Sequence, residues 1–361
     1  MTFRTMRGLA ARAGALLFVA RVVGAQTMSG MPSGHVAGTA PVASAAAATV
    51  TIHHGPDGNL IDIGPIDLPA HAMHDMVRQP PVTALALGMD GWGHGYDVEI
   101  TDAAGKPVPH EILHHMALTD PQRRELFTPL MLRLAAAGTE TAPVILPRFL
   151  GVRVRPTDSV LVSVMVHNPT DRAYHGVHVK LHMHVTSASW WTPTLSVYPV
   201  YLDVMPPTGG HSFDVPAGRS EYHWDGSPAV AGRILGLSGH LHRYGVLLQL
   251  EDRTTHKILW SVKPDTDATG NIKDIPISTF LWKFGIPVRP DHVYRLTAVY
   301  DNPTGKTIFD GGMGAVGGVI HPTGDDWPTV DRANPIYQFD WKYTWRDTIA
   351  PNDAPMRAKH P

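Results

Sequence analysis

The sequence predicts an all-β protein made of two antiparallel β-sandwich domains in tandem, each of a jelly-roll-like form. From Val50 onward, short segments alternate apolar and polar residues with the two-residue period of a half-buried strand. Turn residues separate these segments, as at Asp57-Gly58 and Asn168-Pro169. The chain has 361 residues with 34 glycines and 32 prolines. This length suits two ordinary domains, and many short strands between turns are typical of sandwiches.

The N-terminus resembles a secretory signal peptide over residues 1–25. A basic start precedes a short apolar core at Ala13–Ala20, and Val23-Gly24-Ala25 is a small-residue cleavage site. Residues 26–48 are rich in Ala, Gly, Ser and Pro and predict a flexible linker. No other stretch is apolar and long enough to span a bilayer. We therefore expect a secreted or periplasmic protein without a membrane span after cleavage.

Two domains are predicted at residues 49–189 and 192–347, because strand patterns pause around Trp190-Trp191 and then resume. Residues 348–361 are polar, have no period, and are expected to form a loose tail. A short helix is expected at Asp120–Arg123, where an N-cap residue precedes a proline. The segments that read as strands are 96–101, 160–167, 177–185, 197–204, 233–252 and 293–300.

The composition restricts the chemistry that is open to the protein. Thirty basic residues balance 32 acidic ones, for a formal net charge of −2, which does not favour a nucleic-acid partner. There is no cysteine, which excludes disulfides and thiolate metal ligands. The 22 histidines stand out. Any bound metal must use imidazole, thioether or carboxylate ligands.

One candidate metal site centres on Gly239-His240-Leu241-His242. On a strand His240 and His242 point to the same face, where two imidazoles can bind one ion. Met313 stands alone among glycines just after a second predicted strand. A buried Met usually fills space in a core. Thioether with imidazole is nevertheless a soft ligand set that suits Cu(I).

The adjacent pair His114-His115 gives a second candidate, with His167 further along the chain. Neighbouring residues on a regular strand face opposite ways. Joint binding of one ion by both therefore requires a strand end or a bulge. The alternative is that the pair is incidental and that His167 is a turn residue bonded to backbone.

Two further histidine groups are weaker candidates. His182 and His184 share a polar face with Lys180, and a positive side chain disfavours a cation site, so we interpret them as a solvated or domain-facing row. The segment containing His71 and His74 has copper-binding residue types but lies in a loop, with no strand to fix its geometry.

Five stretches in order resemble the copper type II, ascorbate-dependent monooxygenases, the family of peptidylglycine α-hydroxylating monooxygenase and dopamine β-monooxygenase. The similarity runs from about Tyr96 to Ile320. Each motif is short, but their common order makes the resemblance more specific than any one of them. The matching stretches are Leu113-His114-His115-Met116, 146–154, Val166-His167-Asn168-Pro169, Gly239-His240-Leu241-His242 and 302–313.

The resemblance implies two sandwich domains that each hold one copper ion. By position, the first ion would be bound by His114, His115 and His167, and the second by His240, His242 and Met313. In the family the second centre is catalytic: it binds O2 and attacks a C–H bond of a small-molecule substrate. The first centre delivers an electron supplied by ascorbate. Met disfavours Cu(II) relative to Cu(I), which suits an oxygen-reactive centre.

The chain departs from the family at substrate-contacting positions. Ser238 stands where peptide-amidating members carry an arginine, and Gly317 where they carry a tyrosine. The family's disulfide cysteines are missing. The expected function is therefore a secreted copper monooxygenase that does not amidate peptides. Two alternatives remain: a non-catalytic copper storage or delivery protein on the same fold, and a structural sandwich pair that binds no metal.

Overall fold

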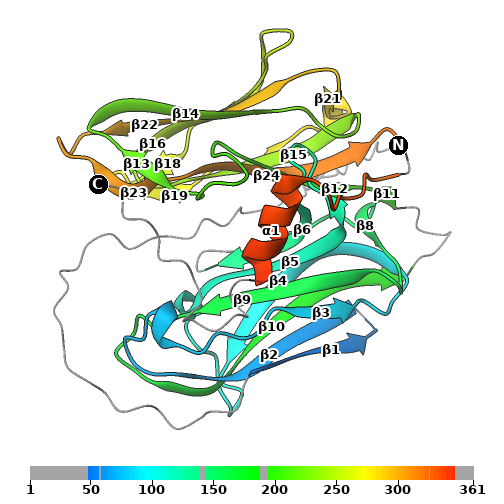
Figure 1. Cartoon of the computed structure of the whole chain (residues 1–361), viewed down its shortest axis with the longest axis vertical. Coiled ribbons are helices and arrows are strands. Elements are labelled where there is room, and N and C mark those ends of the chain that lie inside the picture. The colour runs from blue at the N-terminus through cyan, green and yellow to red at the C-terminus, as the bar shows by residue number, and fades with distance from the viewer. Residues whose placement is uncertain (1–47, 57, 139–143, 188–193, 325, 346–361) are drawn as a thin grey trace, which may run out of the picture.

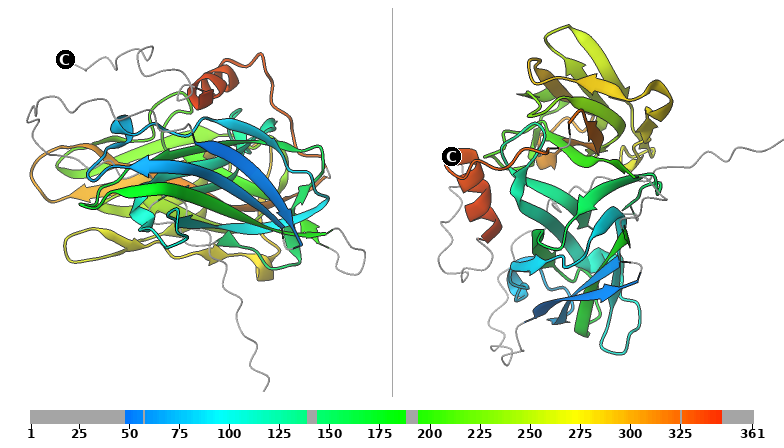
Figure 2. Two further views of the ribbon diagram at one scale, coloured as in Figure 1. Left: turned by 90° about the horizontal axis from the view of Figure 1, so that it is seen from below. Right: turned by 90° about the vertical axis from the view of Figure 1, so that its right-hand side faces the viewer.

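The computed structural model describes five ranges of the chain, which we call the described residues. They are 48–56, 58–138, 144–187, 194–324 and 326–345. The predicted signal peptide, the linker apart from Ala48, and the tail at 348–361 lie outside them, as does the expected boundary at 190–191. The all-β prediction is confirmed, since antiparallel sheets dominate the described residues and only one α-helix occurs there. Figures 1 and 2 show two stacked groups of sheets. We call residues 48–187 the first half and 194–324 the second half.

The first half contains two facing sheets, the larger of which gains its edge strand β11 from the second half. One sheet has the order β1-β2-β10-β4-β8-β11 with β7 paired to β4, and the other has the order β3-β9-β5-β6. The strands of the larger sheet are β1 (Thr49–Gly55), β2 (Gly58–Leu68), β10 (Tyr174–Ser187), β4 (Gly91–Thr101), β8 (Leu150–Val154), β11 (Leu195–Ser196) and β7 (Val144–Ile145). Those of the smaller are β3 (Thr83–Ala86), β9 (Ser159–Val166), β5 (Leu113–Arg124) and β6 (Met131–Gly138).

The apolar positions of these strands meet between the two sheets. Ile61, Val179 and Leu181 of the larger sheet pack in one core with Leu118 and Val162 of the smaller, and all five are at most 1% exposed. Burying an aliphatic side chain of this size stabilises a fold by roughly 1.5–3 kcal/mol. The two-residue alternation seen in the sequence therefore predicts this core directly.

The second half repeats the arrangement. One sheet has the order β12-β24-β15-β20 with β21 paired to β15, and the other β14-β22-β16-β17. The strands are β12 (Tyr198–Asp203), β24 (Gly314–Pro322), β15 (Gly232–Leu241), β20 (Ser278–Thr279), β21 (Ile286–Val288), β14 (Gly218–Gly226), β22 (Tyr294–Asn302), β16 (Gly245–Asp252) and β17 (Lys257–Val262). Two small two-stranded sheets pair β13 (Phe213–Val215) with β23 (Ile308–Gly312) and β18 (Asp265–Thr266) with β19 (Ile272–Asp274). Short 3-10 turns are η1 (His74–Met76), η2 (His110–Ile112) and η3 (Leu281–Lys283).

The two halves are joined by shared packing. Leu126, Phe127 and Leu132 of the first half belong to the core of the second half. A separate apolar cluster places Leu150 of the first half with Leu235 of the second. The prediction of two domains at 49–189 and 192–347 therefore describes halves that fold against each other across a substantial apolar contact.

The helix α1 (Pro335–Trp345) lies beside the contact between the halves in Figure 1, and the sequence reading missed it. Tyr337 packs with Met131 and Leu161 of the first half. The Asp340 carboxylate accepts a hydrogen bond of 2.8 Å from the Met131 amide. The helix thus returns from the end of the second half to cover the first. No helix among the described residues is long and apolar enough to cross a membrane.

Two local predictions need correction. The helix expected at Asp120–Arg123 is wrong: these residues end β5, where the register to β6 shifts between Asp120 and Arg124. The Asp120 carboxylate accepts the amides of Gln122 and Arg123, so it caps an irregular stretch of strand with the same hydrogen bonds that an N-cap makes. The segment 233–252 is two strands, β15 and β16, joined by a turn in which Tyr244 has a positive φ of 68°.

Candidate metal centres

Strand pairing brings His242 and Met313 together. β15 pairs with β24 so that His240 faces Ala315 and Leu241 faces Gly314. Continued by one residue, this register sets His242 opposite Met313. Directly opposed residues of an antiparallel pair have Cβ atoms about 5 Å apart, and diagonal neighbours lie within reach of long side chains. The sequence prediction that these three residues share one site therefore agrees with the register.

The three side chains lie on the face of this sheet that is turned toward the first half. Leu241 and Val316 point into the core of the second half. Alternation then directs His240, His242 and Met313 to the opposite face. Val319, on that same face, packs against the cluster that contains Leu150 of the first half. The candidate site therefore lies on the same sheet face as Val319, and Met313 is only 6% exposed.

The His240 and His242 rings are 5.0 Å apart between centroids and nearly perpendicular, at 88°. The Nε2 atoms of both are buried and have no hydrogen-bond partner among the described residues. Burial lowers the pKa of His240 to about 3, with a smaller contribution from His242. Burial also lowers the pKa of His242. Both rings are neutral at pH 7, and a buried nitrogen without a partner is costly unless something binds it.

Tyr300 of β22 ties the two ligand segments together. Its hydroxyl accepts hydrogen bonds of 3.0 Å from the backbone amides of both His242 and Met313. The same hydroxyl donates to the Met313 carbonyl. The side chain is fully buried, and burial raises its pKa, which keeps the hydroxyl protonated. Sequence reasoning missed Tyr300, because only the fold reveals a contact across two sheets.

The first cluster depends on a bulge. Leu113 pairs with Val166 but His115 pairs with Met165, so that the register shifts between them and His114 is the extra residue. The requirement stated from the sequence, a bulge or strand end at His114-His115, is confirmed. His167 follows β9 directly, and its amide donates to the Ile112 carbonyl at 3.0 Å. The two ends of the paired strands thus bring all three histidines together.

The three rings of the first cluster contact one another. His114 is 5.1 Å from both His115 and His167 between ring centroids, and the Nδ1 atoms of His114 and His115 are 2.9 Å apart. The His167 Nε2 donates to the Glu111 carbonyl at 2.7 Å. Because neutral imidazole has one donor nitrogen, this bond leaves the lone pair of His167 on Nδ1.

Burial and neighbouring charges lower the pKa values of two histidines of this cluster. The pKa of His114 is lowered to about 4, first by burial and then by His115, His167 and His74. The pKa of His115 is also lowered to about 4, by burial and by the positive forms of His74 and His211. Neutral imidazoles are the form that binds metal ions.

The residue types of both proposed ligand sets suit copper, and their histidine rings are spaced as rings that share one ion would be. Two imidazoles bound to one ion at about 2.0 Å with a tetrahedral angle have ring centroids about 5 Å apart. The observed 5.0 and 5.1 Å agree with that spacing. No group of three His, Asp or Glu side chains in the described residues has converged into a finished metal site. Binding therefore requires small ring rotations in the first cluster and uses the Met313 thioether in the second.

A histidine of the second half approaches the first cluster. His211, which precedes β13, lowers the pKa of His115. Its Nδ1 is 3.0 Å from the Asp203 carboxylate. Asp203 pairs with Ala315, which in turn pairs with His240. The paired residues Asp203, Ala315 and His240 form one row across the β12-β24-β15 sheet. Through Asp203 and its partner His211, this row connects the second candidate site to the surroundings of the first cluster. No sequence pattern pointed to His211.

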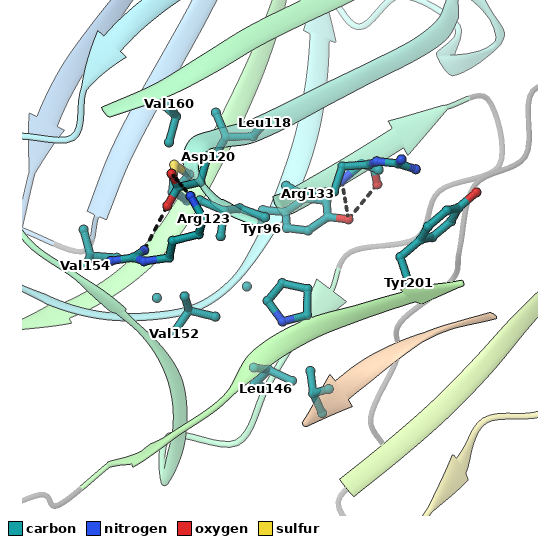
Figure 3. A pocket seen from close by; sticks show the side chains of 18 of the residues that line it. Tyr96, Leu118, Asp120, Arg123, Arg133, Leu146, Val152, Val154, Val160 and Tyr201 are labelled. Atoms are coloured by element: carbon teal, nitrogen blue, oxygen red, sulfur yellow. Dashed lines mark hydrogen bonds and ion pairs between the residues drawn. The ribbon is translucent and has the colours of Figure 1, made fainter. Parts of the chain in front are cut away.

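A cavity of about 190 Å³ lies between the first half and the β12-β24 face. Its walls are largely aliphatic, with Val152, Val154 and Leu146 on one side, and Figure 3 shows Arg123 bonded to Asp120 at its edge. Gly317 also lines it, paired with both Tyr201 and Ser238. None of the six predicted ligand residues lines this cavity.

His182 and His184 both have carboxylate partners. His184 Nε2 lies 2.6 Å from Asp97, and His182 Nε2 lies 3.5 Å from Glu99, both along β4. This arrangement agrees with the interpretation of His182 and His184 as a partly solvated row. The structure brings neither of them to the two clusters.

Comparisons with known proteins supply no family. No protein-family model and no curated protein matches the chain. Among solved structures, that of infectious bursal disease virus strain Gx is 10% identical with a TM-score of 0.20, over 79% of this chain and 75% of that chain. The structure of strain Gt of the same virus is 8% identical with a TM-score of 0.15, over 78% and 72%. Similarity this low carries no argument about function.

Proposed function

We propose that the protein is a secreted copper-dependent monooxygenase that hydroxylates a C–H bond with O2 and a reductant such as ascorbate. One observation supports this proposal above the others: the buried Nε2 atoms of His240 and His242 have no partner and share a sheet face with Met313. A structural histidine pair would have its buried nitrogens satisfied. Two imidazoles and a thioether are a ligand set that favours Cu(I).

The residues divide between two roles in this proposal. His240, His242 and Met313 hold the ion that supplies O2 chemistry when bound, and Tyr300 fixes the backbone of the last two. His114, His115 and His167 hold an ion that supplies electrons. The proposal requires imidazoles free of protons, and burial lowers the pKa values of His114, His115 and His240. Met313 is shielded from bulk water, at 6% exposure.

The substrate in this proposal carries no carboxylate to be bound beside the second site. Ser238 is buried at 2% exposure and donates its hydroxyl to the Ile275 carbonyl. The paired Gly317 has no side chain. Neither Ser238 nor Gly317 carries a charge, so neither can replace the arginine that holds the substrate carboxylate in peptide-amidating members. Glycine-extended peptides are therefore not the proposed substrates.

The test is oxygen consumption by the copper-loaded protein with ascorbate over a panel of neutral aromatic and aliphatic compounds, amines and phenols. Product that contains one atom from labelled O2, absent in His240→Ala, supports the monooxygenase. The second candidate, a copper storage or delivery protein, is favoured by the replacement of the substrate-contacting positions with Ser238 and Gly317. Two bound copper ions with no substrate-dependent oxygen consumption would decide for that candidate.

A further inference from the structure

A fourth histidine lies beside the first cluster. His74 begins η1 in the connection between β2 and β3. Its ring centroid is 5.6 Å from that of His114, close to the 5.1 Å that separates His114 from each of His115 and His167. The His74 side chain is on the surface, whereas the other three are partly buried. It therefore lies at the solvent side of the cluster.

The loop that carries His74 is held against the strand end that carries His167. The amide of His71 donates to the Thr170 carbonyl at 2.9 Å. The amide of Asn168 donates to the Ala72 carbonyl at 2.7 Å, and the two residues form a bridge. These bonds explain why a segment nearly a hundred residues upstream lies beside His167.

Gln79 fixes the turn itself. Its amide nitrogen donates to the carbonyl of His74 at 2.7 Å and to that of Val166 at 2.9 Å. Its amide oxygen accepts the Val166 amide at 2.8 Å. One side chain thus binds the backbone of His74 and the residue before His167. The position of His74 is built into the fold, and only the ring remains free to rotate.

We propose that His74 is a fourth imidazole ligand of the first copper centre, together with His114, His115 and His167. This inference rests on the proposed function, since it presumes that copper binds there. Four neutral imidazoles complete a four-coordinate centre, whereas His240, His242 and Met313 leave a position open. The first centre is then closed to O2 and other small ligands and transfers electrons only. The difference between the two centres follows from ligand number as well as from ligand type.

The test uses full-length protein in which His240→Ala and His242→Ala remove the second site. Copper bound to this parent then reports on the first cluster alone. Into it we introduce His74→Ala and, as a matched control on the same loop, His71→Asn. His71 has a positive φ of 54°, which asparagine tolerates well. Thermal melts of the apo-proteins verify that each variant folds.

Two readouts distinguish a ligand from a neighbour. Cu(I) affinity, measured by competition with a chromophoric chelator, should fall about tenfold or more in His74→Ala, since even residues outside the ligand set change metal affinity by about 10- to 100-fold. Carbon monoxide, followed by infrared spectroscopy, should bind Cu(I) in His74→Ala but not in the parent or in His71→Asn.

Unchanged affinity in His74→Ala, or carbon monoxide binding to the parent, would overturn the role of His74 and leave the proposed function standing. A parent that binds no copper would overturn the proposed function at the first site, and this inference with it.

Discussion

Replacing Tyr300 with phenylalanine tests whether the fold is built to position the second ligand set. The hydroxyl of this fully buried residue makes three backbone hydrogen bonds, two to Met313 and one to His242. A buried hydrogen bond contributes about 1 kcal/mol, and a partner left unsatisfied costs about 1–3 kcal/mol. Tyr300→Phe should therefore lower the free energy of unfolding of the apo-protein by about 3 kcal/mol.

Tyr294→Phe is a matched control on the same strand. Tyr294 is also buried, at 1% exposure, but its hydroxyl accepts only one hydrogen bond, from the Arg289 amide at 3.0 Å. The expected loss is about 1 kcal/mol. Tyr294→Phe touches neither ligand segment, so its copper binding should equal that of the unmodified protein.

Chemical denaturation measures the stability of both variants, and chelator competition measures their Cu(I) affinity. Tyr300→Phe should lower the affinity for one of the two Cu(I) ions by about tenfold, in the range typical of residues that orient metal ligands. The affinity for the other ion should be unchanged. If Tyr300→Phe and Tyr294→Phe lose the same stability and both retain full copper affinity, the assignment of Tyr300 as the residue that positions His242 and Met313 is refuted.

Three further predictions concern Met313, the first histidine cluster and the buried Glu125. Met313→Ala should weaken the binding of one Cu(I) ion and remove sulfur scattering from the X-ray absorption of the reduced protein. Persistent sulfur scattering would contradict the ligand assignment. Copper affinity at the first cluster should fall below about pH 4, since the pKa values of His114 and His115 are lowered to about 4 and protons then compete with the metal for both rings. Glu125 is buried and its pKa is raised from 4.5 to about 7, so the folded state retains a proton that the unfolded state releases, and stability falls as the pH rises through that interval. Denaturation series across pH should show this slope in the unmodified protein and lose it in Glu125→Gln; an unchanged slope would contradict the raised pKa.

The strands and the two histidine pairs of the proposed ligand sets were predictable because each depends on a short-range pattern. Alternation of apolar residues identified the strands that form the cores, for example 177–185 within β10. The spacing of His240 and His242 placed them on one face, and the adjacency of His114 and His115 required the bulge that the structure contains. The connection to Met313 came from the order of motifs, and the strand register agrees with it.

Other features depend on contacts that no short pattern encodes. The helical signal at Asp120–Arg123 failed because the same capping carboxylate also stabilises a bulged strand end. The helix α1 carries aromatic residues on several sides, which obscured a helical period. His74 approaches the first cluster on a loop that long-range hydrogen bonds from Gln79 and Asn168 hold against the end of β9. The approach of His211 becomes visible only when the halves are folded together.

Copper stoichiometry on the full-length chain, combined with X-ray absorption of the reduced form, tests the central claim most directly. After loading with excess copper and desalting, the protein should retain two ions per chain, and the averaged copper environment should show imidazole ligands with one sulfur for every two ions. The double variant His240→Ala/His242→Ala should retain one ion without sulfur. One ion or none in the unmodified protein, or no sulfur contribution at all, would contradict the account.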